Sequence, residues 1–118
     1  MTKQQIFNRA ARHLLTQNKR CVDNEGNCQY RYSGLKCAAG VLIPDHKYCK
    51  EMEGASWTFA NAKPSLKKIV QQVGHKRFVV ELQLVHDRNT PDKWAGILVC
   101  VGEHHNLDTT VVEKYRQR

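Results

Sequence analysis

The stretch at residues 28–54 constrains the fold most, because it joins small residues, an apolar run and a chain-breaking pair. Small side chains occupy positions 37–40, where they would let another segment of backbone approach closely. A branched apolar run at 41–43 follows, and Pro44-Asp45 then stops it. The stretch also gathers Cys, His, Asp and Gly, as an active-site loop would. We interpret it instead as a packing junction.

The segments before and after position 33 predict different local structure. Two β-prone runs at 20–22 and 28–32 flank the turn-rich segment 23–27, which is typical of a β-hairpin. Positions 35–43 indicate a short buried helix, with a buried strand as the alternative for so short a run. A further helical turn is expected over 46–52.

Helical spacing of apolar residues dominates the rest of the chain. Thr2 and Gln5 fit a capping box at the start of the first helix. Residues 77–88 fit both strand alternation and helical spacing. We favour a helix because residues 87–91 have the composition of a helix end followed by the beginning of a new helix. The predicted helices cover residues 3–18, 64–73, 77–88, 91–104 and a short segment from 110.

These patterns predict a mainly α (α+β) fold. With 118 residues the chain is long enough for one hydrophobic core, so we expect a single compact helical domain over 1–118. It would contain five to six helices and one small antiparallel β-hairpin near residues 20–32. Trp57 and Phe59 are expected in the core, with stacking on nucleobases as the alternative.

Composition places the protein in a reducing, aqueous compartment. No apolar run approaches the roughly 20 residues of a membrane span, and the polar start is not typical of a secretory signal. The five cysteines form no C-x-x-C pair, which argues against a zinc ribbon and favours reduced thiols. We therefore expect no cofactor and no metal, with a site built from scattered Cys and His ligands as the alternative.

A net charge of +8 favours an acidic partner, most simply nucleic acid or the acidic face of another protein. The first 22 residues contain five Lys and Arg and no acid. A cationic ridge with an aromatic platform would suit nucleic acid, although a basic surface can also serve solubility alone. The candidate binding residues are Arg9, Arg12, Lys19, Arg20, Arg31 and Tyr30.

Catalytic signatures are sparse in the sequence. Cys37 is a candidate nucleophile if a helix begins beside it and lowers its pKa, but packing is the favoured role. Asp45-His46 and His86-Asp87 are His-Asp neighbours, yet adjacent helical residues point about 100° apart, so neither predicts a preformed dyad. His86 is expected at a helix end or core edge. Cys100 and His104-His105 would offer a metal too few ligands.

One motif carries a resemblance. The run Y-R-Y-S-G-L-K-C-A-A-G-V-L-I-P-D-H-K-Y at 30–48, followed by M-E-G at 52–54, resembles short, mostly uncharacterised proteins of tailed bacteriophages and prophages. Leu82-Gln83 with His86-Asp87 and the opening helix look similar too, so the likeness spans most of the chain. Cys49 and His104-His105 lie outside the pattern.

The resemblance implies a context. Small phage proteins of this kind often bind and redirect a host complex, so we expect a phage-encoded accessory protein in the host cytoplasm. It would bind a host protein or protein–nucleic acid complex stoichiometrically, for example to inhibit a host defence system, as anti-CRISPR proteins do. The alternatives are direct DNA or RNA binding through the basic ridge, and a small enzyme using Cys37 or His86.

Overall fold

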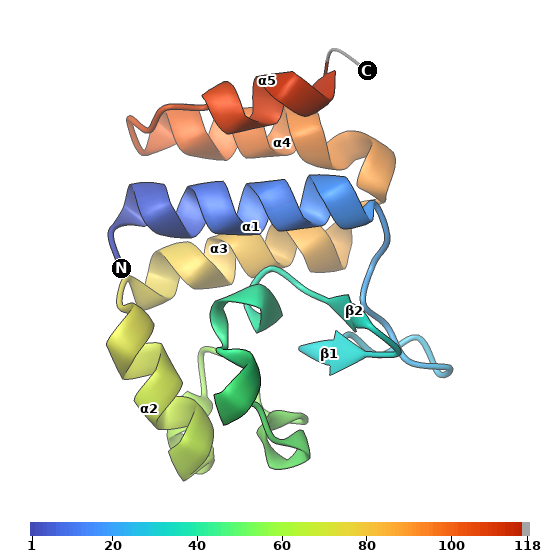
Figure 1. The fold of residues 1–118 in the computed structure, drawn as a ribbon, viewed down its shortest axis with the longest axis vertical. Helices are drawn as coiled ribbons and strands as arrows, with labels where there is room; N and C mark the ends of the chain where they lie inside the picture. Colours follow the sequence, from blue (N-terminus) through green and yellow to red (C-terminus); the bar gives the residue numbers. More distant parts are fainter. Residues whose placement is uncertain (117–118) are drawn as a thin grey trace.

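The computed structural model describes residues 1–116, and in this part of the chain it has five α-helices and one short hairpin, which lies to one side of the molecule below α1 and α3 (Figure 1). This confirms the predicted mainly helical domain with one small antiparallel hairpin. The α-helices are α1 (Lys3–Gln17), α2 (Pro64–Val73), α3 (Lys76–Arg88), α4 (Pro91–His104) and α5 (Thr110–Arg116), and the strands are β1 (Arg31–Tyr32) and β2 (Leu35–Lys36).

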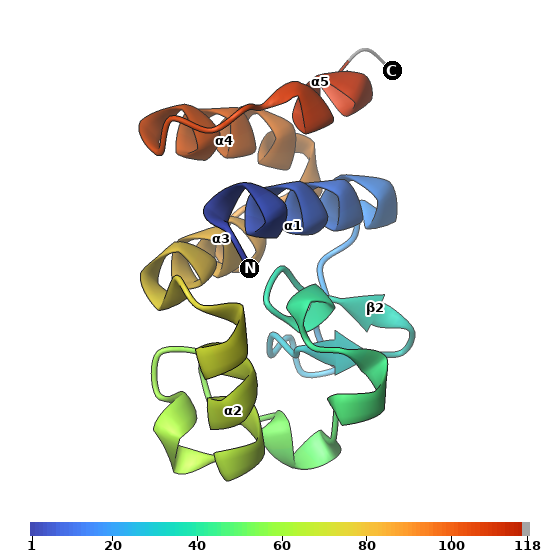
Figure 2. The ribbon, with the colours of Figure 1, turned by 60° about the vertical axis from the view of Figure 1, so that its left-hand side comes forward.

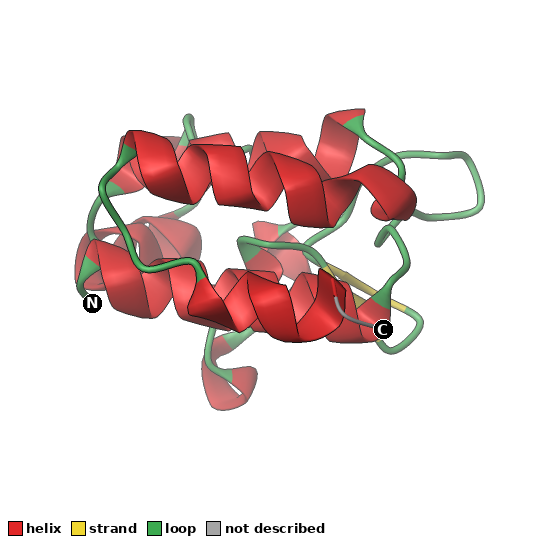
Figure 3. Ribbon diagram, turned by 90° about the horizontal axis from the view of Figure 1, so that it is seen from above, coloured by secondary structure: helices red, strands yellow, loops and turns green. Residues whose placement is uncertain are grey.

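Helix α1 lies at the centre of the helical half, in contact with α3, α4 and α5 (Figure 1). The predicted capping box is present: Gln5 N donates to Thr2 Oγ1, and Thr2 N donates to the Gln5 side chain. Neighbouring helices cover α1 on several sides, and they fully bury Ile6, Phe7, Ala10, Ala11 and Leu14. Figure 3 shows the axes of the long helices lying roughly parallel to one another.

The hairpin lies further along the chain than predicted. Its strands pair Arg31 with Lys36 and Tyr32 with Leu35, around a two-residue turn in which Ser33 and Gly34 both have positive φ. Such a turn matches the twist of paired strands. The expected pairing around the loop at 23–27 shrinks to a single bridge between residues 22 and 28.

The segment predicted as helix at 35–43 and 46–52 forms no α-helix. It contains β2 and then three short 3₁₀ helices, Gly40–Leu42, Asp45–Lys47 and Lys50–Met52. Long-range hydrogen bonds explain the difference, because the main chain of Lys36 is bound on both sides by the Gln17 side chain. Cys37 N likewise donates to the carbonyl of Tyr30 rather than to a helical neighbour.

The two aromatic residues expected in the core behave differently. Trp57 is buried as predicted, whereas Phe59 is 74% exposed, so the prediction for Phe59 is wrong. Both precede the 3₁₀ helix Ala60–Ala62, which packs against α2 at the end of the molecule away from α4 and α5 (Figure 2). Among the described residues, no helix is long and apolar enough to cross a membrane.

Candidate functional site

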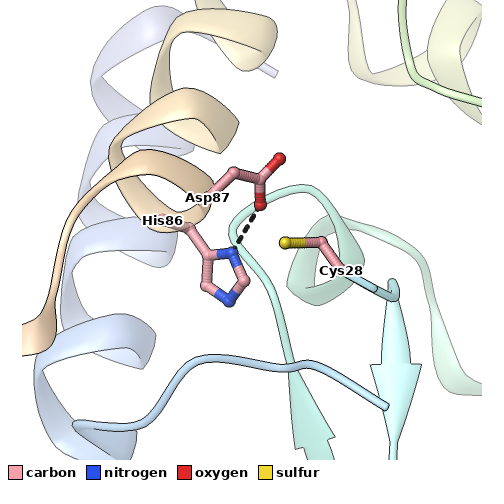
Figure 4. A group of neighbouring side chains, drawn as sticks. All are labelled: Cys28, His86 and Asp87. Atoms are coloured by element: carbon pink, nitrogen blue, oxygen red, sulfur yellow. Dashed lines mark hydrogen bonds and ion pairs between the residues drawn. The ribbon is translucent and has the colours of Figure 1, made fainter. Parts of the chain in front are cut away.

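Three side chains able to bind metals or take part in acid–base chemistry meet where the last turn of α3 faces the loop before β1 (Figure 4). His86 and Asp87 come from α3, and Cys28 comes from the loop. A ring nitrogen, a carboxylate oxygen and the sulfur of these residues all lie within 4.8 Å of one another. We refer to Cys28, His86 and Asp87 as the polar cluster.

Contrary to the sequence-based prediction, His86 and Asp87 do form a preformed pair. His86 Nδ1 lies 2.7 Å from Asp87 Oδ1 (Figure 4). The side chains of neighbouring helical residues leave the helix about 100° apart. Nδ1 is, however, the ring nitrogen nearest the main chain, so the carboxylate of the next residue reaches it. Gln83 Nε2 donates to the same oxygen at 2.8 Å, one helical turn earlier.

The other ring nitrogen of His86 is also occupied. Cys21 N donates to His86 Nε2 at 2.8 Å, so Nε2 is the acceptor and Nδ1 carries the proton that Asp87 receives in a hydrogen bond. The ring is fully buried and stacks on Trp94 of α4, with 5.6 Å between the ring centroids. His86 therefore lies at a helix end, as predicted, but inside the core.

Arg20 completes the connection between the loop and α3. Its guanidinium donates to the backbone carbonyl of Asp87 at 2.7 Å and lies 3.5 Å from Cys28 Sγ. A cation at a helix C-terminus stabilises the unpaired carbonyls there. The charged group of Arg20, a candidate residue for binding a partner, thus makes contacts within the fold.

The cluster shifts the pKa values of its acid and its thiol in opposite directions. Burial opposes ionisation of Asp87, but hydrogen bonds from His86, Cys28 and Gln83 outweigh it and hold the pKa of Asp87 below its usual value. Burial, followed by the charge of Asp87, raises the pKa of Cys28. Cys28 is therefore held as a thiol at neutral pH.

This arrangement favours structural cohesion over catalysis or metal binding. A nucleophilic cysteine needs a lowered pKa, and a general base needs a free lone pair that faces its substrate. Neither condition is met, because the thiol is held neutral and both nitrogens of His86 are hydrogen-bonded. An ion at Nδ1 would have to displace that proton while Nε2 still faced an N–H donor, beside the guanidinium of Arg20.

A cavity of about 290 Å³ lies next to the polar cluster. Trp57 lines it, and the indole Nε1 of Trp57 is buried with no hydrogen-bond partner among the described residues. Glu53 also lines the cavity, but its carboxylate accepts hydrogen bonds from Tyr30 N, Arg31 N and Tyr48 Oη at 2.6–3.1 Å. Most polar groups of the cavity wall thus already hold the fold together.

Cys37, the candidate nucleophile, is fully buried in the same wall. No helix begins at Cys37, and burial raises the pKa of its thiol, so the expected lowering of the pKa is wrong. Its sulfur accepts a hydrogen bond from Gly40 N at 3.2 Å. Packing, the role favoured from the sequence, is what the structure shows.

The predicted basic ridge divides into internal and exposed residues. Tyr30 is buried and its hydroxyl donates to the carbonyl of Ala55 at 2.7 Å, so its ring is no open platform. Arg31 pairs with Asp45 at 2.9 Å, donates to the carbonyl of Ile43 and lies over the ring of Tyr48. Both residues, like Arg20, hold the fold together.

Arg9, Arg12 and Lys19 are exposed. Arg9 and Arg12 follow Gln5 on one outward stripe of α1, at positions i, i+4 and i+7. Arg12 also lines a hollow of about 260 Å³ that Lys114 of α5 shares, so the structure brings a cation of the C-terminal helix to this stripe. Among the predicted binding residues, Arg9, Arg12 and Lys19 are thus the exposed ones.

Asp87 of the polar cluster and its hydrogen-bond partner Gln83 carried a local signal in the sequence. Gln83 and Asp87 are four positions apart, a spacing that places them on one helical face. Glu53 had no such signal beyond its place in the M-E-G run, because its three partners lie between 5 and 23 positions away.

We expect Asp87→Asn to destabilise the protein at neutral pH by about 1–2 kcal/mol, since a charge-assisted hydrogen bond to a buried imidazole is weakened. The folded pKa of Asp87 is depressed, so its stabilisation is present above the unfolded pKa and is lost as pH falls through the folded value. Urea unfolding from about pH 3 to pH 7 should show the gap closing below about pH 4.

The exposed Glu25 provides the control for this prediction. Glu25→Gln should leave the stability at neutral pH within about 0.5 kcal/mol of the parent. A constant difference between Asp87→Asn and the parent across this pH range would show that the charge of Asp87 adds nothing to the fold.

Comparison of the chain with protein-family models, with curated proteins and with solved structures finds no match.

Proposed function

We propose that this protein acts by stoichiometric binding to another protein, or to a protein–nucleic acid complex, rather than by catalysis. One observation carries the proposal: Phe59 and Leu84 are large apolar side chains that are 74% and 38% exposed. Scattered single apolar residues on a surface are ordinary, but an aromatic side chain exposed to this extent is typical of contact surfaces.

The chemistry of the buried groups supports the same proposal. The thiols of Cys28 and Cys37 have raised pKa values, and His86 is hydrogen-bonded through both nitrogens. The motif at 30–54, which resembles phage proteins, is occupied by packing contacts in its buried part. A phage accessory protein that binds a host complex, such as a defence system, is consistent with these features.

An affinity purification tests the proposal. The protein would serve as bait in a bacterial lysate, with and without nuclease, and a Phe59→Ser/Leu84→Ser double variant would serve as the matched bait. We expect a partner in near-equal amount with the parent protein in nuclease-treated lysate, and its loss with the variant. Failure of the parent bait to retain any specific partner contradicts the proposal.

Direct nucleic-acid binding is the second candidate, and the exposed stripe of Arg9 and Arg12 with Lys114 nearby favours it. Reversing Arg9, Arg12 and Lys19 to Glu should then weaken binding to duplex DNA or RNA at least about tenfold at low salt. The slope of affinity against salt should fall in the same variant, since each lost phosphate contact removes about 0.9 of slope. Fluorescence anisotropy with labelled oligonucleotides measures both.

A charge-matched control distinguishes a local effect of the α1 stripe on nucleic-acid binding from a general effect of net charge. Lys50, Lys67 and Lys68 are exposed away from α1, and their reversal to Glu changes the net charge by the same amount. If both triple variants lose the same amount of nucleic-acid affinity, the loss is due to net charge alone and the α1 stripe is not the binding site.

A further inference from the structure

Two hollows run along the outer face of α3. One is about 410 Å³ and opens toward Thr58, and the other is about 510 Å³ and opens toward Lys3 and His105. They share Lys76, Arg77 and Glu81 in their linings, so the two hollows adjoin one another along α3. We refer to the two hollows together as the α3 groove.

The hollow toward Thr58 has an apolar floor. Val80 and Leu84 lie one turn apart on α3, and both line it. Phe59 directly follows Thr58, which forms the opposite wall. Of the two exposed apolar residues that support the proposed binding function, Leu84 therefore lines this groove and Phe59 is the chain neighbour of a residue that does.

The charges around the α3 groove are mostly positive. Lys3, Lys76 and Arg77 line it, and Glu81 is the one carboxylate in the lining. His105 Nε2 lies 2.9 Å from a Glu81 oxygen, and Lys3 Nζ lies 3.4 Å from His105 Nδ1. Glu81 is thus bound within a Lys3–His105–Glu81 chain, which leaves Lys76 and Arg77 to face a partner.

We propose that the α3 groove docks an acidic amphipathic segment of a partner protein, in the manner of a helix laid into a groove. This inference rests on the proposed binding function and names the chemistry of its partner. Apolar side chains of the segment would cover Val80 and Leu84, and its carboxylates would meet Lys76 and Arg77. An apolar floor beside two cations suits a peptide, because a phosphate backbone offers nothing to cover Val80 and Leu84.

The test selects random displayed peptides on the intact parent protein. We expect enrichment of peptides that combine Asp or Glu with Leu or aromatic residues at helical spacing. Selected peptides should bind at least about tenfold more weakly to Arg77→Glu and to Leu84→Asp. Lys67→Glu, an exposed reversal on α2, should leave their binding unchanged. Circular dichroism melting of each variant confirms that it is folded.

Several outcomes overturn the inference. Enrichment of basic or uncharged peptides, no enrichment, or acidic peptides insensitive to both α3 variants would each do so. Duplex DNA that displaces the peptides and loses affinity in Arg77→Glu would assign the groove to nucleic acid instead. These results are independent of the affinity purification from lysate. A partner that binds there through another surface would support the proposed binding function even if the peptide selection contradicts the α3 groove as the docking site.

Discussion

Replacing Gly40 with alanine is expected to destabilise the protein by about 3–5 kcal/mol, a large share of the stability of an ordinary domain. A Cβ at position 40 would lie 2.0 Å from the carbonyl oxygen of Tyr30 and 2.9 Å from its carbonyl carbon. Backbone cannot move aside as the end of a long side chain can, and this carbonyl also accepts a hydrogen bond from Cys37 N at 3.2 Å.

Gly96 provides the matched control for this substitution. It lies within α4, and a Cβ there meets nothing within 4 Å. Gly96→Ala should therefore stabilise the protein by about 0.5–1 kcal/mol, since alanine favours helix. Thermal and urea unfolding of both variants measure the difference. A cooperative transition for Gly40→Ala within about 1 kcal/mol of the parent would show that the two segments need not lie so close.

The second large effect is expected for Glu53→Ala, at about 2–4 kcal/mol. The substitution removes the acceptor for two backbone N–H groups, of Tyr30 and Arg31, and for the hydroxyl of Tyr48. Buried donors left without an acceptor cost more than the net value of the bonds themselves. The three losses share one carboxylate, so they are not additive.

Glu51→Ala is the control for Glu53→Ala, because Glu51 is exposed in the 3₁₀ helix that ends directly before Glu53. Its effect on the free energy of unfolding should stay within about 0.5 kcal/mol. Urea unfolding followed by far-UV circular dichroism compares the two variants. Equal midpoints for Glu51→Ala and Glu53→Ala would mean that water replaces the carboxylate without cost.

Local signals predicted the helical half of the fold well. The capping box of Thr2 and Gln5 is formed, and α3 is a helix despite its strand-like alternation. In both cases the signal lies within a few residues. The capping box marks the beginning of α1, and residues 87–91 mark the end of α3 and the beginning of α4. The segment at 35–52 was mispredicted because side chains distant in sequence, such as Gln17, bind its backbone.

The candidate site shows the same division. The spacing of Gln83 and Asp87 is readable from the chain, whereas the bond from Cys21 N to His86 joins residues 65 positions apart. The basic ridge was predicted from charge alone, and charge does not tell which cations the fold uses internally. Arg20 and Arg31 have nearby acceptors that only the folded chain provides.

The backbone of Tyr30 is bound on both sides, by Glu53 at its N–H and by Cys37 at its carbonyl, with Gly40 packed against the latter. Residues 20–54 contain little regular structure, so they would ordinarily be taken as the region that opens first. Because Cys21 also holds His86 of α3, opening here must break contacts of the helical core. The hydrogen-bonded amides of Cys21, Tyr30 and Cys37 should therefore exchange with solvent together, nearly as slowly as those of the helices.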